Sequence, residues 1–204
     1  MPNSAQHDFR TTELDPDLLS TPFRVQTNWC VIAGAPSSGK TTLIGLLASQ
    51  GFQTVPEGAR RYIETEMAKG QTTHPILENG AALQRVIADM QLRTEGGLRA
   101  MDVAFLDGAM PSCLGWYRAY GLNPNEILPE CFHQRYASVF ILDPLPFQPD
   151  PERPAEIAAI AGFLDEWLAR DYSALGYHFL RIPVLPPEER LAFVLDALSE
   201  QPLE

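Results

Sequence analysis

The chain has 204 residues, enough for one domain, and 45% of them are hydrophobic, which is typical of a globular protein. Its formal net charge is −11, so nucleic acid backbones and anionic membrane surfaces are not expected partners. Three widely spaced cysteines lack metal-ligand spacing, and the chain shows neither a signal pattern nor an apolar run of membrane length. We therefore expect a cytoplasmic protein.

The first part of the chain differs in composition from the rest. Residues 1–27 are polar and lack periodicity, which predicts a partly disordered leader in front of a domain that spans residues 28–204. Leu18, Leu19 and Phe23 are the leader residues that we expect to pack onto this domain.

Strand-like and helix-like segments alternate through the domain. The predicted strands cover residues 29–33, 52–56, 103–106, 136–142 and 177–185. The predicted helices cover residues 40–50, 59–69, a long segment from Asn79, 155–175 and 186–199, and a proline-rich loop covers residues 143–154. This alternation implies right-handed crossovers. The expected fold is α/β: a three-layer α/β/α P-loop NTPase of the nucleoside- or nucleotide-kinase type, with a five-stranded parallel sheet.

A phosphate-binding motif follows the first predicted strand. The stretch GAPSSGKT, residues 34–41, fits G-x-x-x-x-G-K-[ST] and opens an amphipathic helix, the context that separates this motif from an ordinary glycine-rich turn. The glycines let backbone N–H groups face a phosphate, the helix start adds partial positive charge, and the lysine adds a full charge. The residues expected to bind the polyphosphate of ATP are Gly34, Ala35, Pro36, Ser37, Ser38, Gly39, Lys40, Thr41 and Thr42.

Two residues are candidates for holding Mg²⁺. Thr41 offers a hydroxyl next to the phosphates, and Asp107 ends the third predicted strand, where a second metal-side carboxylate is expected. The alternative for Asp107 is that it initiates a turn with Gly108, because Asp-Gly is a common turn pair.

Four further segments give the chain a family resemblance. VPEGARRY, PSCLGWYRAYG, VFILDPLPFQPDPERP and DYSALGYHFLRIPVLPPEER follow the phosphate loop in order. Together they resemble the NadR-type group of P-loop proteins, labelled AAA-domain ATPases, which includes a nicotinamide riboside kinase domain. The resemblance covers residues 29–199 and implies a nucleoside-kinase-like arrangement that binds Mg-NTP. Relatives have Asp-Arg-Gly after the third strand, whereas this chain has Asp107 followed directly by Gly108.

The resemblance and the sheet topology together suggest catalytic residues. Glu57 ends the second predicted strand, at the sheet edge where ligands bind, and in similar kinases a carboxylate there faces the acceptor hydroxyl. The alternative is a helix-start glutamate paired with Arg60 or Arg61. The family pattern favours Arg60 as a substrate contact. Arg153 lies in the loop that forms a lid in P-loop kinases, with a solvated loop arginine as the alternative. Lys40, Glu57, Asp107 and Arg153 are thus the catalytic candidates.

An aromatic and basic cluster provides further candidates for binding the acceptor. Tyr117 is expected to stack on a base or pyridine ring and Arg118 to contact an acceptor phosphate or sugar. Core packing is the favoured interpretation of the neighbouring Trp116 and Tyr120. Gln84 and Gln91, on the long predicted helix, are candidates for contacting a base edge.

Two functions fit these features. One is a kinase that transfers the γ-phosphoryl group of Mg-ATP to a small, nucleoside-like acceptor. The other is an NTPase or nucleotide-dependent switch that acts through a protein partner, which the missing arginine after Asp107 favours. The chain has no N-K-x-D stretch for guanine, so ATP is the expected nucleotide. A homodimer is compatible with either function.

Overall fold

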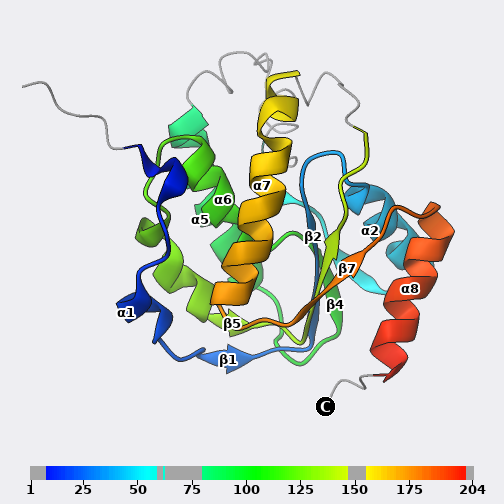
Figure 1. The fold of residues 1–204 in the computed structure, drawn as a ribbon. Coiled ribbons are helices and arrows are strands. Elements are labelled where there is room, and N and C mark those ends of the chain that lie inside the picture. The colour runs from blue at the N-terminus through cyan, green and yellow to red at the C-terminus, as the bar shows by residue number, and fades with distance from the viewer. Residues whose placement is uncertain (1–7, 59–61, 63–79, 147–154, 201–204) are drawn as a thin grey trace, which may run out of the picture.

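The computed structural model describes residues 8–58, 62, 80–146 and 155–200, with the side chains of 155–159 left out. Its centre is a sheet of five parallel strands in the order β3-β4-β2-β6-β7 (Figure 1). The strands are β2 (Trp29–Gly34), β3 (Gln53–Val55), β4 (Ala104–Asp107), β6 (Ser138–Leu142) and β7 (Phe179–Ile182). The predicted five-stranded parallel sheet is therefore confirmed.

Helices cover both faces of the sheet. They are α2 (Lys40–Ser49), α5 (Gly80–Gly96), α6 (Ser112–Ala119), α7 (Ala155–Ala174) and α8 (Pro187–Glu200). The short 3₁₀ helices η2 (Pro124–Glu126) and η3 (Leu128–Phe132) lie between α6 and the strand at Gln134–Arg135. Figure 1 shows α2 and α8 on one side of the strands and α5, α6 and α7 on the other, which confirms the three-layer arrangement.

Alternation along the central strand explains the two apolar layers. Every residue from Trp29 to Ala33 is buried. Cys30 and Ile32 pack in a cluster with residues of α2 and α8, whereas Val31 packs in the larger cluster with residues of α5, α6 and α7. A continuous apolar run is what a parallel strand needs when helices cover both of its faces.

Some element boundaries differ from the sequence predictions. The second and fifth strands, predicted over 52–56 and 177–185, pair only over β3 and β7. Helix α6 was not predicted, since it is short and begins directly after Pro111. The predicted helix over 59–69 and the Asn79 start of the long helix lie outside the described residues, apart from Tyr62.

The described part of the leader contacts the domain along its length. It contains η1 (Phe9–Thr11), α1 (Pro16–Leu19) and β1 (Val25–Gln26), and β1 pairs in parallel with β5 (Gln134–Arg135). Leu14 is buried, and Leu18, Leu19 and Phe23 pack against the larger apolar cluster as expected. The division of the chain at residue 28 stays a prediction. None of the described helices is long and apolar enough to cross a bilayer.

Candidate functional site

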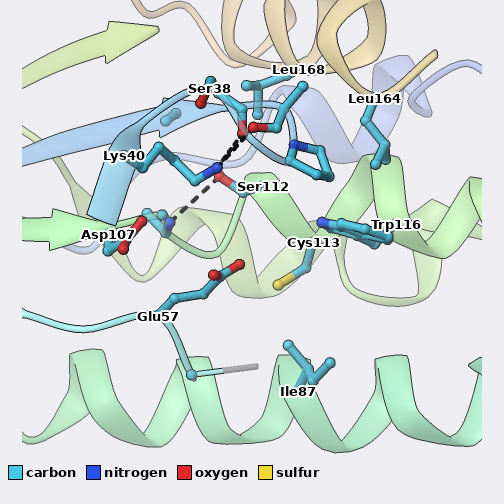
Figure 2. A pocket seen from close by; sticks show the side chains of 18 of the residues that line it. Ser38, Lys40, Glu57, Ile87, Asp107, Ser112, Cys113, Trp116, Leu164 and Leu168 are labelled. Atoms are coloured by element: carbon cyan, nitrogen blue, oxygen red, sulfur yellow. Dashed lines mark hydrogen bonds between the residues drawn. The ribbon is translucent and has the colours of Figure 1, made fainter. Parts of the chain in front are cut away.

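A cavity of about 540 Å³ opens at the carboxyl ends of β2, β3 and β4. The chain leaves β2 at the centre of the sheet, between β4 and β6, which is the position where ligands bind in open α/β sheets. The phosphate loop forms one side of this cavity and α5 the opposite side, as Figure 2 shows from close by. The same cavity includes all nine predicted phosphate-binding residues, 34–42.

The phosphate loop has backbone angles that require small residues. Gly39 precedes α2 with a φ of 92°, and Ser37 has a φ of 64°. A Cβ on Gly34 would lie 2.6 Å from Ser38 Oγ and 3.1 Å from the Leu142 carbonyl oxygen, so no larger residue fits there without a shift. The loop therefore turns tightly into the start of α2, the position whose amides and helix charge favour anions.

Lys40 lies inside this turn. Its Nζ donates to the carbonyl oxygens of Gly34 and Ala35 at 2.8 and 3.0 Å (Figure 2). These contacts hold the ammonium group against the loop, where a bound polyphosphate would meet it.

Thr41 and Asp107 meet across the sheet edge. Thr41 Oγ1 donates to Asp107 Oδ2 at 3.2 Å, and Asp107 is 3% exposed at the end of β4. The register places Asp107 opposite Ile32 of β2, which brings the carboxylate beside the phosphate loop. Hydroxyl and carboxylate oxygens suit Mg²⁺, which takes the rest of its ligands from phosphates and water. The described residues contain no cluster of three His, Cys, Asp or Glu side chains that could hold a metal without such ligands.

Arg190 supports the phosphate loop from α8, a role that the sequence predictions missed. Its Nη1 donates to the Ser38 carbonyl oxygen at 2.6 Å, and the side chain is 3% exposed. A Cβ on Gly39 would lie 3.2 Å from Nη1, so glycine allows this close approach. The available signal was helical spacing, since Arg190 and Val194 form the buried stripe of α8.

Glu57 lies at the carboxyl end of β3, as the sequence predicted, two residues beyond the last residue of that strand. It lines the cavity between the phosphate loop and α5, and its carboxylate points into the open volume (Figure 2). Two arginines predicted to belong to the site, Arg60 and Arg153, lie outside the described residues.

Apolar side chains form the rest of the cavity wall. Leu83 and Ile87 come from α5, and Leu164 and Leu168 come from α7. Trp116 of α6 and Tyr120, directly after that helix, also line the cavity, with ring centroids 6.2 Å apart and planes inclined by 23°. Core packing was the favoured interpretation of these two rings, and the structure corrects it because one helical turn brings both to the cavity side of α6.

Tyr117 and Arg118 do not reach the cavity, in contrast to the prediction that they bind the acceptor. Tyr117 is 3% exposed and packs in the larger apolar cluster. Arg118 is fully buried, and its Nη1 and Nη2 donate to Asp171 at 2.7 and 2.9 Å. Its Nε donates to the Thr12 carbonyl oxygen, and its guanidinium lies 3.9 Å from the Trp167 ring centroid. Every side of this guanidinium is occupied, so its role is to join α6, α7 and the leader.

Comparison with known proteins supports this description of the fold. A family model described as an AAA domain matches residues 29–190. A NadR protein in complex with NR has a TM-score of 0.65 and 20% identity, covering 87% of this chain and 52% of that chain. A NadR protein in complex with NAD and AMP-PNP has a TM-score of 0.63 and 20% identity, and the match covers 85% of this chain and 49% of that chain. Thymidylate kinase from Candida albicans has a TM-score of 0.60 and 10% identity, and the match covers 86% of this chain and 92% of that chain.

The extent of these matches bounds what they show. The chain spans about half the length of the NadR chains that it matches. No curated protein matches it. The similarities therefore establish the fold that this chain shares with the NadR chains and the thymidylate kinase.

Proposed function

The chain belongs to the AAA-domain family, whose model matches residues 29–190, and on that premise we propose that it is an ATP-dependent phosphotransferase acting on the hydroxyl group of a small, nucleoside-like acceptor. One observation carries this proposal: the phosphate loop and Glu57 face the same cavity, which continues into an apolar compartment between α5, α6 and α7. A nucleotide tail and a small acceptor would therefore meet inside one enclosed volume.

The phosphate loop would hold the nucleotide. Its inward amides and the Lys40 ammonium neutralise the polyphosphate, and Arg190 keeps the Ser38 carbonyl oxygen turned away from it. Thr41 and Asp107 would hold Mg²⁺, which supplies positive charge to the phosphoryl oxygens when bound.

Glu57 would orient the acceptor. Its carboxylate accepts the proton of the acceptor hydroxyl as that oxygen bonds to the γ-phosphorus, and the bond from phosphorus to the ADP oxygen breaks. The apolar walls, including Trp116 and Leu164, exclude water and so favour transfer over hydrolysis. By family resemblance, Arg60 would contact the substrate and Arg153 would approach the transferring group.

The experiment is an acceptor screen. The full-length protein is incubated with ATP, Mg²⁺ and a panel of nucleosides that includes nicotinamide riboside, and products are identified by mass spectrometry. A product heavier by one phosphoryl group, formed with stoichiometric ADP, supports the proposal. Consumption of ATP with inorganic phosphate as the sole product would instead favour the NTPase or switch.

A further inference from the structure

A buried carboxylate lies behind the cavity. Glu95 of α5 is 1% exposed and accepts hydrogen bonds from Gln91 Nε2, the Met110 backbone N–H and the Tyr136 hydroxyl, each at 2.8 Å. Burial raises the pKa of Glu95, and these three donors oppose that rise. Among the described residues its three hydrogen-bond partners are all neutral, so Glu95 is held by hydrogen-bond donors rather than by an ion pair.

The hydrogen bond to Glu95 fixes the orientation of the Gln91 side chain. Glu95 Oε1 accepts hydrogen bonds from both Gln91 Nε2 and the Met110 N–H, so the NH₂ end of the Gln91 amide faces the carboxyl group. Since the amide is planar, with nitrogen and oxygen on opposite sides, Oε1 has to face away from Glu95. Glu95 also accepts hydrogen bonds from Met110 and Tyr136, which lie in two other parts of the chain. These two bonds hold the carboxyl group in this position.

The Gln91 oxygen faces the cavity beside Glu57. Gln91 lines the cavity and is 7% exposed. A Cβ on Gly58 would lie 3.6 Å from Gln91 Oε1, which places that oxygen next to the residue that follows Glu57. Within the described part of the chain, no hydrogen-bond donor is found for Gln91 Oε1. The cavity therefore presents an acceptor oxygen of fixed orientation next to the Glu57 carboxylate.

We propose that Gln91 determines specificity and that Glu95 positions it: the site takes acceptors that direct a second O–H or N–H donor, beside the reacting hydroxyl, at Gln91 Oε1. This inference rests on the proposed phosphotransferase function. An acceptor without that donor would cover this carbonyl oxygen and leave it unpaired, and sites built on such hydrogen bonds reject analogues that lack the group. The expected discrimination is about 5- to 150-fold in kcat/KM.

The test compares matched acceptors across matched variants. A nucleoside that the protein phosphorylates is paired with analogues in which one donor is removed: 2′-fluoro, 3′-fluoro, or a base whose exocyclic amino group is replaced by hydrogen. The wild type should lose about 5- to 150-fold in kcat/KM on one of these analogues. Gln91→Leu should bring the ratio of kcat/KM for the parent nucleoside to kcat/KM for that analogue close to one. The change should come mainly from a lower kcat/KM for the parent nucleoside.

Glu95→Gln tests the positioning role separately. An amide at position 95 can donate to the Gln91 oxygen, so the Gln91 side chain is free to turn and the ratio should fall. A merely structural role for Glu95 would lower kcat/KM for parent and analogue equally and leave the ratio unchanged. Arg93→Gln on the exposed side of α5 is the control and should keep the wild-type ratio.

The outcomes separate the two proposals. A wild type that phosphorylates its acceptor with no discrimination, or a ratio that survives Gln91→Leu, overturns this inference and leaves the phosphotransferase function standing. A wild type that phosphorylates no nucleoside overturns both. If circular dichroism shows that Glu95→Gln does not fold, the Gln91→Leu ratio decides the question.

Discussion

Arg118 and Asp171 form a bidentate ion pair, with N–O distances of 2.7 and 2.9 Å, that joins α6 to α7 inside the protein. Both side chains are almost completely buried, at 0% and 2% exposure. These two helices carry Trp116, Leu164 and Leu168 of the cavity wall. The ion pair therefore fixes the spacing of the elements that form the acceptor compartment.

Removing one partner of this pair should be costly. Arg118→Met leaves the Asp171 carboxylate buried without its cation, and we expect the free energy of unfolding to fall by about 3–5 kcal/mol in urea titrations. The double variant Arg118→Met/Asp171→Leu should recover much of that loss, because it removes both buried charges. Arg93→Gln, at an exposed pair with Asp89, should change stability by less than about 1 kcal/mol. Equal losses in the single and double variants would contradict this account.

Lys40→Ala should remove nucleotide binding and leave the fold intact. The variant loses the ammonium charge that the loop holds at 2.8 Å from the Gly34 carbonyl oxygen. We expect ATP affinity, measured by isothermal titration calorimetry, to fall at least about 10-fold, the size of one charge-assisted contact. Circular dichroism should be unchanged. An ATP affinity equal to that of the wild type would exclude the assigned role of the loop.

Thr41 variants should separate metal binding from packing. Thr41→Val keeps the side-chain shape but removes the hydroxyl that lies 3.2 Å from Asp107 Oδ2, whereas Thr41→Ser keeps the hydroxyl. In titrations of turnover against Mg²⁺, we expect Thr41→Val to need on the order of 10-fold more Mg²⁺ or higher. Thr41→Ser should stay close to the wild type, and similar curves for both variants would argue against a metal ligand here.

Gly80→Ala should disturb the aromatic wall of the cavity. A Cβ on Gly80 would overlap the Tyr120 ring, so the ring has to move and we expect the free energy of unfolding to fall by about 1–3 kcal/mol. Gly45→Ala is the matched control, since nothing lies within 4 Å of its Cβ in the interior of α2. It should stabilise the protein by about 0.5–1 kcal/mol. Thermal denaturation should show a lower melting temperature for Gly80→Ala and a higher one for Gly45→Ala than for the wild type.

Cys113, on the cavity wall, should resist alkylation in the native protein. Burial, followed by the charges of Glu95 and Glu57, raises the pKa of its thiol to about 12. At pH 8 the native thiolate fraction is then about one in 10⁴, against roughly one in four for an unfolded cysteine. Iodoacetamide labelling followed by mass spectrometry should be roughly a thousand times slower without urea than with it. Comparable rates in both conditions would place the thiol in a different environment.

The parts of the site that depend on residues close together in the sequence could be predicted from local patterns. The phosphate loop is a contiguous stretch, and Asp107 and Glu57 were placed by where their strands end, so all three were found in the expected cavity. The NadR-type resemblance was also confirmed.

Residues whose partners are distant in the chain were not predictable in this way. Arg118 meets Asp171 across 53 positions, Arg190 meets Ser38 across 152, and Glu95 meets Tyr136 across 41. Arg118 was expected to bind the acceptor because arginine beside aromatic residues is typical of ligand sites. Only the packing of α6 on α7 shows that its charge is already neutralised.

The early segment of the chain depends on partners that are made much later. Asp15 binds Asn125, the Thr12 carbonyl oxygen accepts from Arg118, and Glu13 pairs with Arg170, at separations of 110, 106 and 157 positions. At a synthesis rate of about 5–20 residues per second, these contacts become available roughly five to thirty seconds after the segment itself is made. Until Phe132 and Tyr177 are made, Phe23 lacks the two rings that it packs against, so this apolar side chain is uncovered for that part of translation.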